Sequence, residues 1–452
     1  MPIDLSPAGE PSAYPARGPR LVPWLIVWGL CCAIGAAAVL LLWPTGTPAS
    51  GAWFWFCVAG LPNGLFLILF GIARAGYEAA YLGALYRNQH RQAWLHQRVG
   101  DAQRPLEVLG VGYCLPLQGA TLAQALARTA PLIKAQSPRG GLDAIVHGRF
   151  ADDDPLFVAL SEDEEPPPSE DPQTGDESAP THAPAAVPEA VSPVTTLLAQ
   201  ALAPLAHSVH ALCRNGAKYA PAVRVMASPD VTELRLKQVR DALRLAGLPA
   251  LACEVVPAAD GLMAADAWLD AGDTRPLLVV AAEWHTKPPA GSTEGAVAVL
   301  LGAPAPARPE PVGVMATLHR PVAGALDALP DVLANAALWG KADARAIRTA
   351  WISGLDSSND GRLSAAFKQA SLAGVAPHDA QRRPDRIIGH AGAAGGWLAI
   401  AAAIEACESV SVDPQLIVHA PQSTHSTESA QAAILYVTPI VNTPPSHDDP
   451  DE

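Results

Sequence analysis

The chain has 452 residues, of which 50% are hydrophobic, and its formal net charge is −14. This acidic balance argues against nucleic acid as a partner, because phosphate binding requires a basic surface. The seven cysteines form no CxxC pair and show no metal-ligand spacing, so the sequence predicts neither a metal site nor a bound cofactor. Heavy use of Ala, Gly and Pro is typical of a GC-rich bacterial genome.

Two uncharged apolar segments near the N-terminus, residues 21–43 and 52–73, predict a transmembrane helical hairpin over residues 21–74. Each is long enough to cross a bilayer core of about 30 Å. The link between them, residues 44–51, is too short for anything but a turn. A secretory signal peptide is the competing interpretation. The length of the first segment and the second segment directly after it argue against that alternative.

Arginines flank both ends of this hairpin: Arg17 and Arg20 precede it, and Arg74 and Arg87 follow it. Because positive residues stay inside, residues 1–20 are expected to form a cytoplasmic tail. Residues 75–104 are expected to form a juxtamembrane helix. The sequence therefore predicts a protein of the bacterial inner membrane with its soluble domain in the cytoplasm. Asn63, inside the second segment, is expected to hydrogen-bond to the neighbouring helix.

The rest of the chain alternates short apolar strands with helices, which predicts a mainly parallel sheet covered by helices on both faces. The expected α/β domain comprises residues 105–150 and 194–440, in two similar halves of about 105–302 and 303–440. Residues 151–193 are acidic and Pro-rich, which is typical of a disordered insertion, and residues 441–452 form an acidic tail. The expected helices lie at 121–135, 195–213, 231–246, 261–271, 326–337, 363–373 and 391–407, and the expected strands at 105–117, 223–227, 251–256, 277–282, 296–301, 312–318, 349–352, 416–419 and 432–437.

Four segments, in the right order, resemble the thiolase-like fold of β-ketoacyl synthases. They are residues 109–117 (LGVGYCLPL), 257–283, 292–302 (STEGAVAVLLG) and 389–406 (GHAGAAGGWLAIAAAIEA). The last resembles the glycine-rich turn and helix that carry one catalytic histidine in that family. The resemblance implies a thiolase-like layered α/β domain and a site built from an acylated cysteine and two histidines.

When the family's catalytic positions are matched to this sequence one by one, the resemblance implies that most of the catalytic residues are missing. The family's Cys-x-x-Gly spacing, which ends here at Gly261, places Ala258 where the nucleophile belongs. The first histidine aligns near Leu355, the second matches His390, and the family's lysine aligns near Asp385. Alanine cannot be acylated, and leucine cannot donate a hydrogen bond. His390 alone is more simply read as a structural histidine around which the glycine-rich turn packs.

Three weaker signals in the sequence have simpler explanations than a functional site. Cys253 precedes Ala258 by five residues but falls inside an expected strand, which makes it a poor displaced nucleophile. A calcium-loop pattern that starts at Asp356 has Phe367 where a bidentate Glu is required. His207 and His210 lie one helical turn apart with no recognisable third ligand, so a solvated helix face is expected there.

A membrane-tethered enzyme fold without its nucleophile is expected to be a binding module. The layout also resembles the adaptor proteins of bacterial type VI secretion that accompany antibacterial lipase effectors. That resemblance implies two partners, a secreted lipase effector and a secretion spike protein. The alternatives are a membrane-associated ketosynthase-like enzyme, or a non-catalytic subunit that dimerises with one. An enzyme requires a polar, accessible pocket near His390, whereas an adaptor can fill that pocket with side chains.

Overall fold

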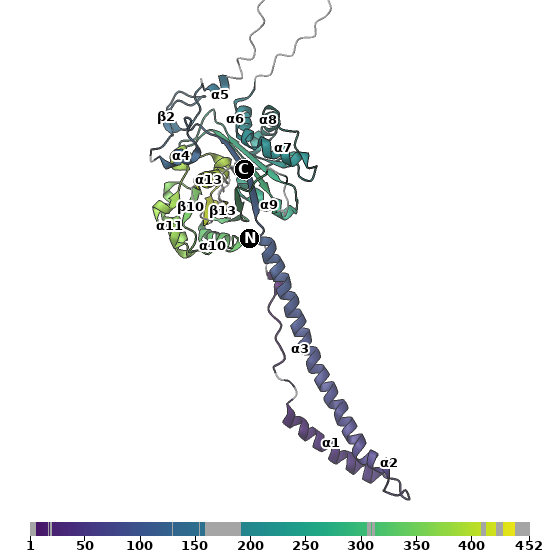
Figure 1. The fold of residues 1–452 in the computed structure, drawn as a ribbon. Coiled ribbons are helices and arrows are strands. Elements are labelled where there is room, and N and C mark those ends of the chain that lie inside the picture. Colours follow the sequence, from purple (N-terminus) through teal and green to yellow (C-terminus); the bar gives the residue numbers. More distant parts are fainter. Residues whose placement is uncertain are drawn as a thin grey trace, which may run out of the picture. The chain divides into compact units, whose positions relative to one another are not determined.

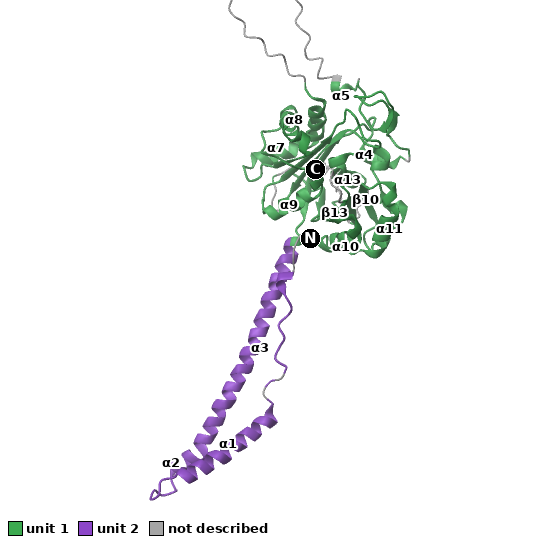
Figure 2. Ribbon diagram, turned by 180° about the vertical axis from the view of Figure 1, so that it is seen from behind, with its two compact units in different colours: residues 1–2, 102–452 green, residues 3–101 purple. Residues whose placement is uncertain are grey.

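The structure of this protein is a computed structural model, drawn in Figure 1. It describes residues 6–16, 18, 20–128, 130–152, 154–158, 191–304, 309, 312–407, 413–421 and 428–438. Most of the expected acidic insertion, and all of the expected acidic tail, lie outside the described residues. The chain divides into two compact units, residues 3–101 and residues 1–2 with 102–452, which Figure 2 colours separately.

The smaller unit consists of two long apolar helical segments. The first is α1 (Leu21–Leu42), and the second is one uninterrupted helix built from α2 (Ala52–Trp55), a π-helical turn (Phe56–Gly60) and α3 (Leu61–Ala102). The π turn ends at Gly60, two residues before Pro62, whose missing N–H removes one helical hydrogen bond.

The two helical segments contact each other through polar and small residues. As expected, Asn63 bonds to the neighbouring helix: its Oδ1 accepts a hydrogen bond from Trp28 Nε1 at 2.8 Å. A Cβ on Gly35 would lie only 2.4 Å from Pro62 Cγ, so glycine permits this close approach.

Three helical segments of the described chain are long and apolar enough to cross a membrane, judged by length and composition. They are Leu21–Leu42, Ala52–Ala102 and Pro193–Arg214. The third is 56% buried over its most apolar window, so it packs into the larger unit. The first two have apolar windows that are 0% and 11% buried within the structure, which leaves their apolar faces without protein cover.

The larger unit contains one mixed sheet of eleven strands within the described residues. The mainly parallel sheet expected from the sequence is wrong, because only three neighbouring strands in each half pair parallel and the other pairings are antiparallel. The strands are β1 (Leu106–Cys114), β4 (Ala222–Ala227), β5 (Cys253–Pro257), β6 (Leu277–Glu283), β7 (Gly295–Gly302), β8 (Ala316–Leu318), β9 (Val322–Ala325), β10 (Thr349–Ser353), β11 (Gln381–Arg382), β12 (Pro414–His419) and β13 (Ser429–Val437). The short strands β2 (Lys134–Gln136) and β3 (Ile145–His147) pair separately.

The strand order shows an internal duplication. The first half runs β1-β7-β6-β4-β5, and the second half runs β8-β13-β12-β10-β11. Numbered along the chain, each half has the order 1-5-4-2-3, with the fifth strand antiparallel to its neighbours. The halves join where β1 pairs antiparallel with β8, through Leu106 opposite Leu318. The two halves therefore share one strand order.

Helices lie on both faces of each half. They are α4 (Leu122–Ala127), α5 (Pro155–Val158), α6 (Pro193–Leu202), α7 (Ala206–Arg214), α8 (Thr232–Leu245), α9 (Met263–Ala271), α10 (Leu329–Trp339), α11 (Asp360–Gln369), α12 (Asp385–Ile388) and α13 (Gly395–Glu405). Strand β7 lies between two hydrophobic cores, because alternate side chains of a strand point to opposite faces of the sheet. Val297, Val299 and Leu301 face the core around α13. Ala298 and Leu300 face the core around α6 and α8.

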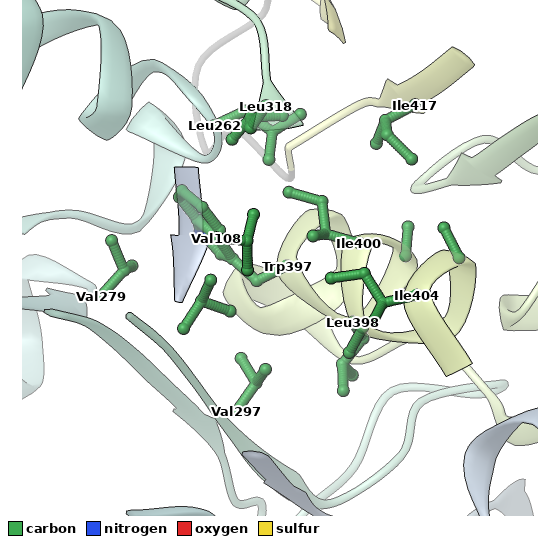
Figure 3. Packing of buried hydrophobic residues seen from close by; sticks show 14 of the residues in the cluster. Val108, Leu262, Val279, Val297, Leu318, Trp397, Leu398, Ile400, Ile404 and Ile417 are labelled. Carbon is green, nitrogen blue, oxygen red and sulfur yellow. The ribbon is translucent and has the colours of Figure 1, made fainter. Parts of the chain in front are cut away.

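Helix α13 is the central helix of this unit. Its residues from Gly395 to Ile404 are all buried, as its uniformly apolar sequence predicts. Figure 3 shows Trp397 and Ile400 of this helix among Val108 from the first half and Ile417 from the second. The helix therefore contacts both halves.

Three expected elements differ markedly from those in the structure. The helix expected at 121–135 ends at Ala127, because Arg128 adopts an extended conformation shortly before Pro131. The helix expected at 195–213 is divided by a 3₁₀ turn that contains Pro204. The strand expected at 312–318 is reduced to β8, and β9 follows after Pro321.

Candidate functional site

A cleft of about 880 Å³ lies where the parallel strands of both halves end. Its lining includes Ser228 directly after β4, Ala258 after β5, Glu283 at the end of β6, Leu355 after β10 and Ala420 after β12. The carboxyl ends of parallel strands are the usual position of binding sites in α/β sheets, because loops and helix starts meet there.

The three site positions inferred from the sequence meet in this cleft: Ala258, Leu355 and His390 all line it. They come from the first half, from the second half, and from the glycine-rich turn before α13. The cleft is open and is not filled by side chains. An open cleft near His390 was the feature expected of an enzyme, whereas an adaptor could have had this pocket filled.

Ala258 begins a tight turn that Gln431 of β13 holds in place. The Gln431 side chain accepts a hydrogen bond from Leu262 N at 2.8 Å and donates one to Asp260 O at 2.9 Å. Gly261 has φ +50°, and a Cβ there would lie 2.5 Å from Gln431 Oε1. The glycine of the Cys-x-x-Gly spacing is therefore required by the structure of this turn, although alanine occupies the first position of the spacing.

His390 is fixed by its backbone, while its ring faces a carboxylate. Its N–H donates to Gly291 O at 2.7 Å, and its own carbonyl accepts from Thr293 N at 3.0 Å. The ring Nδ1 lies 3.7 Å from Asp385 Oδ2, which is too long for a hydrogen bond but short enough for an ion pair. Asp385 also accepts a hydrogen bond from Gly354 N at 2.6 Å. Burial raises the pKa of Asp385, which His390 and that hydrogen bond oppose.

Glu283 and His285 form a second carboxylate–imidazole pair at the same cleft. Glu283 Oε1 accepts a hydrogen bond from Ala393 N at 2.9 Å, and its Oε2 lies 3.3 Å from His285 Nε2. A Cβ on Gly392 would lie 2.1 Å from Glu283 Oε1, so the glycine allows this carboxylate to approach the turn. Glu283 was not among the site residues predicted from the sequence. A carboxylate at the end of an otherwise apolar strand is the signal that could have located it.

A buried histidine, His419, lies next to the cleft-lining residue Ala420. His419, at the end of β12, is 0% exposed, and its Nδ1 lies 2.9 Å from Ser353 Oγ. Burial, followed by the nearby His390, lowers the pKa of His419 to about 3. Its ring packs against Gly396, where a Cβ would lie 2.9 Å from His419 Cγ. His419 is therefore a neutral packing group.

The described lining of the cleft contains no cysteine. Cys253 lies at the start of β5, at the opposite end of the strand from Ala258, and its thiol contacts Leu251 O. Burial raises the pKa of Cys253, although Arg240 opposes this, and burial also raises the pKa of Cys114 and of Cys213. A raised thiol pKa lowers the fraction of reactive thiolate.

No group of three or more metal-ligating side chains occurs within the described part of the chain. His210 Nε2 bonds to Gly247 O rather than pairing with His207. Asp356 accepts hydrogen bonds from Ser358 and Asn359, and so caps the 3₁₀ turn Ser357–Asn359 before α11. The calcium-like pattern therefore has a local structural explanation.

No protein-family model matches this chain, and no curated protein sequence matches it. Solved structures with a similar fold include the ketosynthase from module 6 of the bacillaene synthase of Bacillus subtilis 168. It is 10% identical, with a TM-score of 0.50, and the match covers 74% of this chain and 71% of that one. Another is 3-oxoacyl-[acyl-carrier-protein] synthase III from Aquifex aeolicus VF5, at 12% identity and a TM-score of 0.41, covering 73% of this chain and 99% of that one. At such low identity the likeness shows the fold alone: the larger unit has the thiolase-like fold of ketosynthases.

Proposed function

We propose that this protein is a membrane-anchored binding module built on a ketosynthase-like fold without condensing chemistry. The observation that carries the proposal is Ala258 at the turn where the resemblance places an acylated cysteine, in a cleft whose described lining has no thiol. A methyl group cannot form a thioester, so the covalent path is absent. Leu355 likewise offers no hydrogen bond to a bound carbonyl.

The anchor in this proposal is a hairpin of α1 and the helix Ala52–Ala102 in a bacterial inner membrane. Their length, their apolar composition and their nearly complete lack of burial support a membrane environment. The arginines before α1 and in α3 support an orientation with both ends in the cytoplasm.

Reporter fusions test this orientation. A periplasm-specific reporter inserted at Gly46, in the turn between the two helices, is expected to be active, and the same reporter after Glu452 is expected to be silent. A cytoplasm-specific reporter at the same two positions serves as the control and should give the reverse pattern. Activity of the periplasmic reporter after Glu452 would place the larger unit on the other side of the membrane.

The partner we propose is a lipase-type effector of a bacterial type VI secretion system, together with a spike protein of that system. The proposal rests on the resemblance in layout: an apolar N-terminal anchor followed by an α/β body that lacks a nucleophile. Affinity capture with the full-length chain from detergent-solubilised membranes of its own bacterium tests it. We expect a lipase effector to be enriched over a control capture with residues 1–101 alone. Enrichment of an acyl carrier protein or an active ketosynthase instead would contradict the adaptor role.

The open cleft favours a second candidate function, a membrane-associated ketosynthase-like enzyme or a non-catalytic partner subunit in a dimer with one. Its supporting observation is the pair of carboxylate–imidazole contacts, Glu283 with His285 and Asp385 with His390, facing one accessible cavity. Such pairs can hold or move protons. They do not replace the missing nucleophile, so we rank this candidate second.

A further inference from the structure

A second cavity, of about 360 Å³, lies beside the edge strand β11. Four of its seven lining residues, His378, Arg382, Arg383 and Arg386, carry guanidinium or imidazole groups, and the described lining contains no carboxylate. We call these four residues the arginine pocket.

The arginine pocket carries more positive charge than its neighbours neutralise. Asp360 is the one carboxylate paired with it in the described structure. Asp360 Oδ1 accepts from Arg383 Nη1 at 2.5 Å, and Oδ2 accepts from Arg386 Nη2 at 2.6 Å. One carboxylate cannot balance two guanidinium groups. In agreement, the pKa of Arg383 is lowered, mainly by burial and next by the positive charge of Arg386. The opposing effect of Asp360 is smaller than these two together.

The pocket also contains hydrogen-bond donors that the described protein leaves unused. The Arg383 side chain is only 7% exposed, and its Nε is buried without an acceptor, although Gln381 Oε1 accepts from its Nη2 at 2.9 Å. Arg382 is exposed and makes no side-chain hydrogen bond or ion pair within the described residues. The donors of the exposed Arg382 are therefore free to bind an acceptor from a ligand, whereas Arg383 Nε is closed off from the cavity.

We propose that the arginine pocket binds the phosphate group of a small phosphorylated ligand. Planar guanidinium groups bind the oxygens of phosphate in pairs, through short charge-assisted hydrogen bonds. A phosphate monoester carries close to two negative charges and three acceptor oxygens at neutral pH. This matches a pocket with three guanidinium groups and a single opposing carboxylate better than a carboxylate ligand would.

The site is separate from the candidate cleft but adjoins it, because Arg386 lines both cavities. Arg382 lines only the arginine pocket and has no side-chain partner among the described residues, which makes it the best position for a test. Arg362 is the matched control: it lies outside both cavities, is 47% exposed and pairs with the exposed Asp327.

The test is calorimetric titration of the full-length chain with inorganic phosphate, in a maltoside detergent that contains no phosphate and at constant ionic strength. We expect saturable binding of one phosphate, weakened about tenfold in Arg382→Gln (about 1.4 kcal/mol) and unchanged in Arg362→Gln. Acetate, titrated in the same way, is expected to bind more weakly than phosphate.

Three results would overturn the proposal: no saturable binding of phosphate, an equal loss in both variants, or acetate binding as tightly as phosphate. Circular dichroism shows whether Arg382→Gln has kept its fold. If it has not, His378→Gln, a change at an exposed residue of the pocket, must show the weakened phosphate binding for the proposal to stand.

Discussion

Lowering the pH from 6.5 to about 4 is expected to destabilise the larger unit, and His419→Asn is expected to remove most of that pH dependence. In the folded chain His419 is buried and its pKa is lowered from 6.5 to about 3. The unfolded chain binds a proton at this residue over the same range, while the folded chain does not. Stability is therefore fully present above pH 6.5 and is lost as the pH falls. One such group contributes up to about 1.4 kcal/mol per pH unit, or about 3 kcal/mol over this range.

The measurement is urea-induced unfolding of the wild type and the variant at a series of pH values. Asn can still bond to Ser353 Oγ but does not titrate, so its stability curve should be flatter than that of the wild type. The rise in the pKa of Asp385 acts in the opposite direction but is common to both proteins. His378→Asn, at an exposed histidine, is the control and should leave the curve unchanged. Parallel curves for the wild type and His419→Asn would mean that His419 is not the buried neutral group described above.

Ala258→Cys is expected to create a thiol that an acyl thioester can reach in the candidate cleft. Ala258 is partly exposed and lines a cleft of about 880 Å³, so a thiol there can be reached by an acyl thioester. The pKa of Cys114, by contrast, is raised from 9.0 to about 12 by burial and by Asp154. That shift lowers its thiolate fraction about a thousandfold at neutral pH.

Mass spectrometry after incubation with an acyl-coenzyme A measures this difference. We expect an acyl adduct on the variant at position 258, and a much slower reaction with Ala259→Cys. Ala259 is the adjacent exposed residue, which does not line the cleft. Equal acylation at both positions would show that the cleft offers no site for a thioester.

Much of the fold could be predicted from the sequence because its signals are local. The apolar runs that became β4, β5 and β6 alternate with helical patterns, which is enough to indicate that these three strands pair parallel. The uniformly apolar segment that became α13 indicated a helix buried on every side. Element bounds were less certain, because Pro204 and Pro321 interrupt apolar patterns that otherwise read as continuous.

The site could be predicted only in part, because its contacts join residues far apart in the chain. Ala258, Leu355 and His390 were located through the family resemblance, and the structure brings them to one cleft. The contact between Ser353 and His419 spans 66 residues, and neither residue belongs to a recognisable motif. Such a pair becomes visible only when the ends of β10 and β12 are adjacent in the sheet.

The arginine pocket was also invisible in the sequence. Arg382, Arg383 and Arg386 are close in the chain, but a short basic run usually forms a solvated surface. Their significance depends on Asp360, which is shared between two of them, and on the burial of Arg383. Both are properties of the folded chain.

The most direct test of the central claim, a ketosynthase-like fold without a nucleophile, is acylation of the wild-type chain. The full-length protein in detergent is incubated with acyl-coenzyme A and with acyl carrier protein, and its intact mass and tryptic peptides are measured. We expect no acylated residue, because Ala258 cannot form a thioester and the described lining of the cleft contains no thiol. Stoichiometric acylation of Cys253, or of any other residue, would contradict the account and restore an enzymatic role for the cleft.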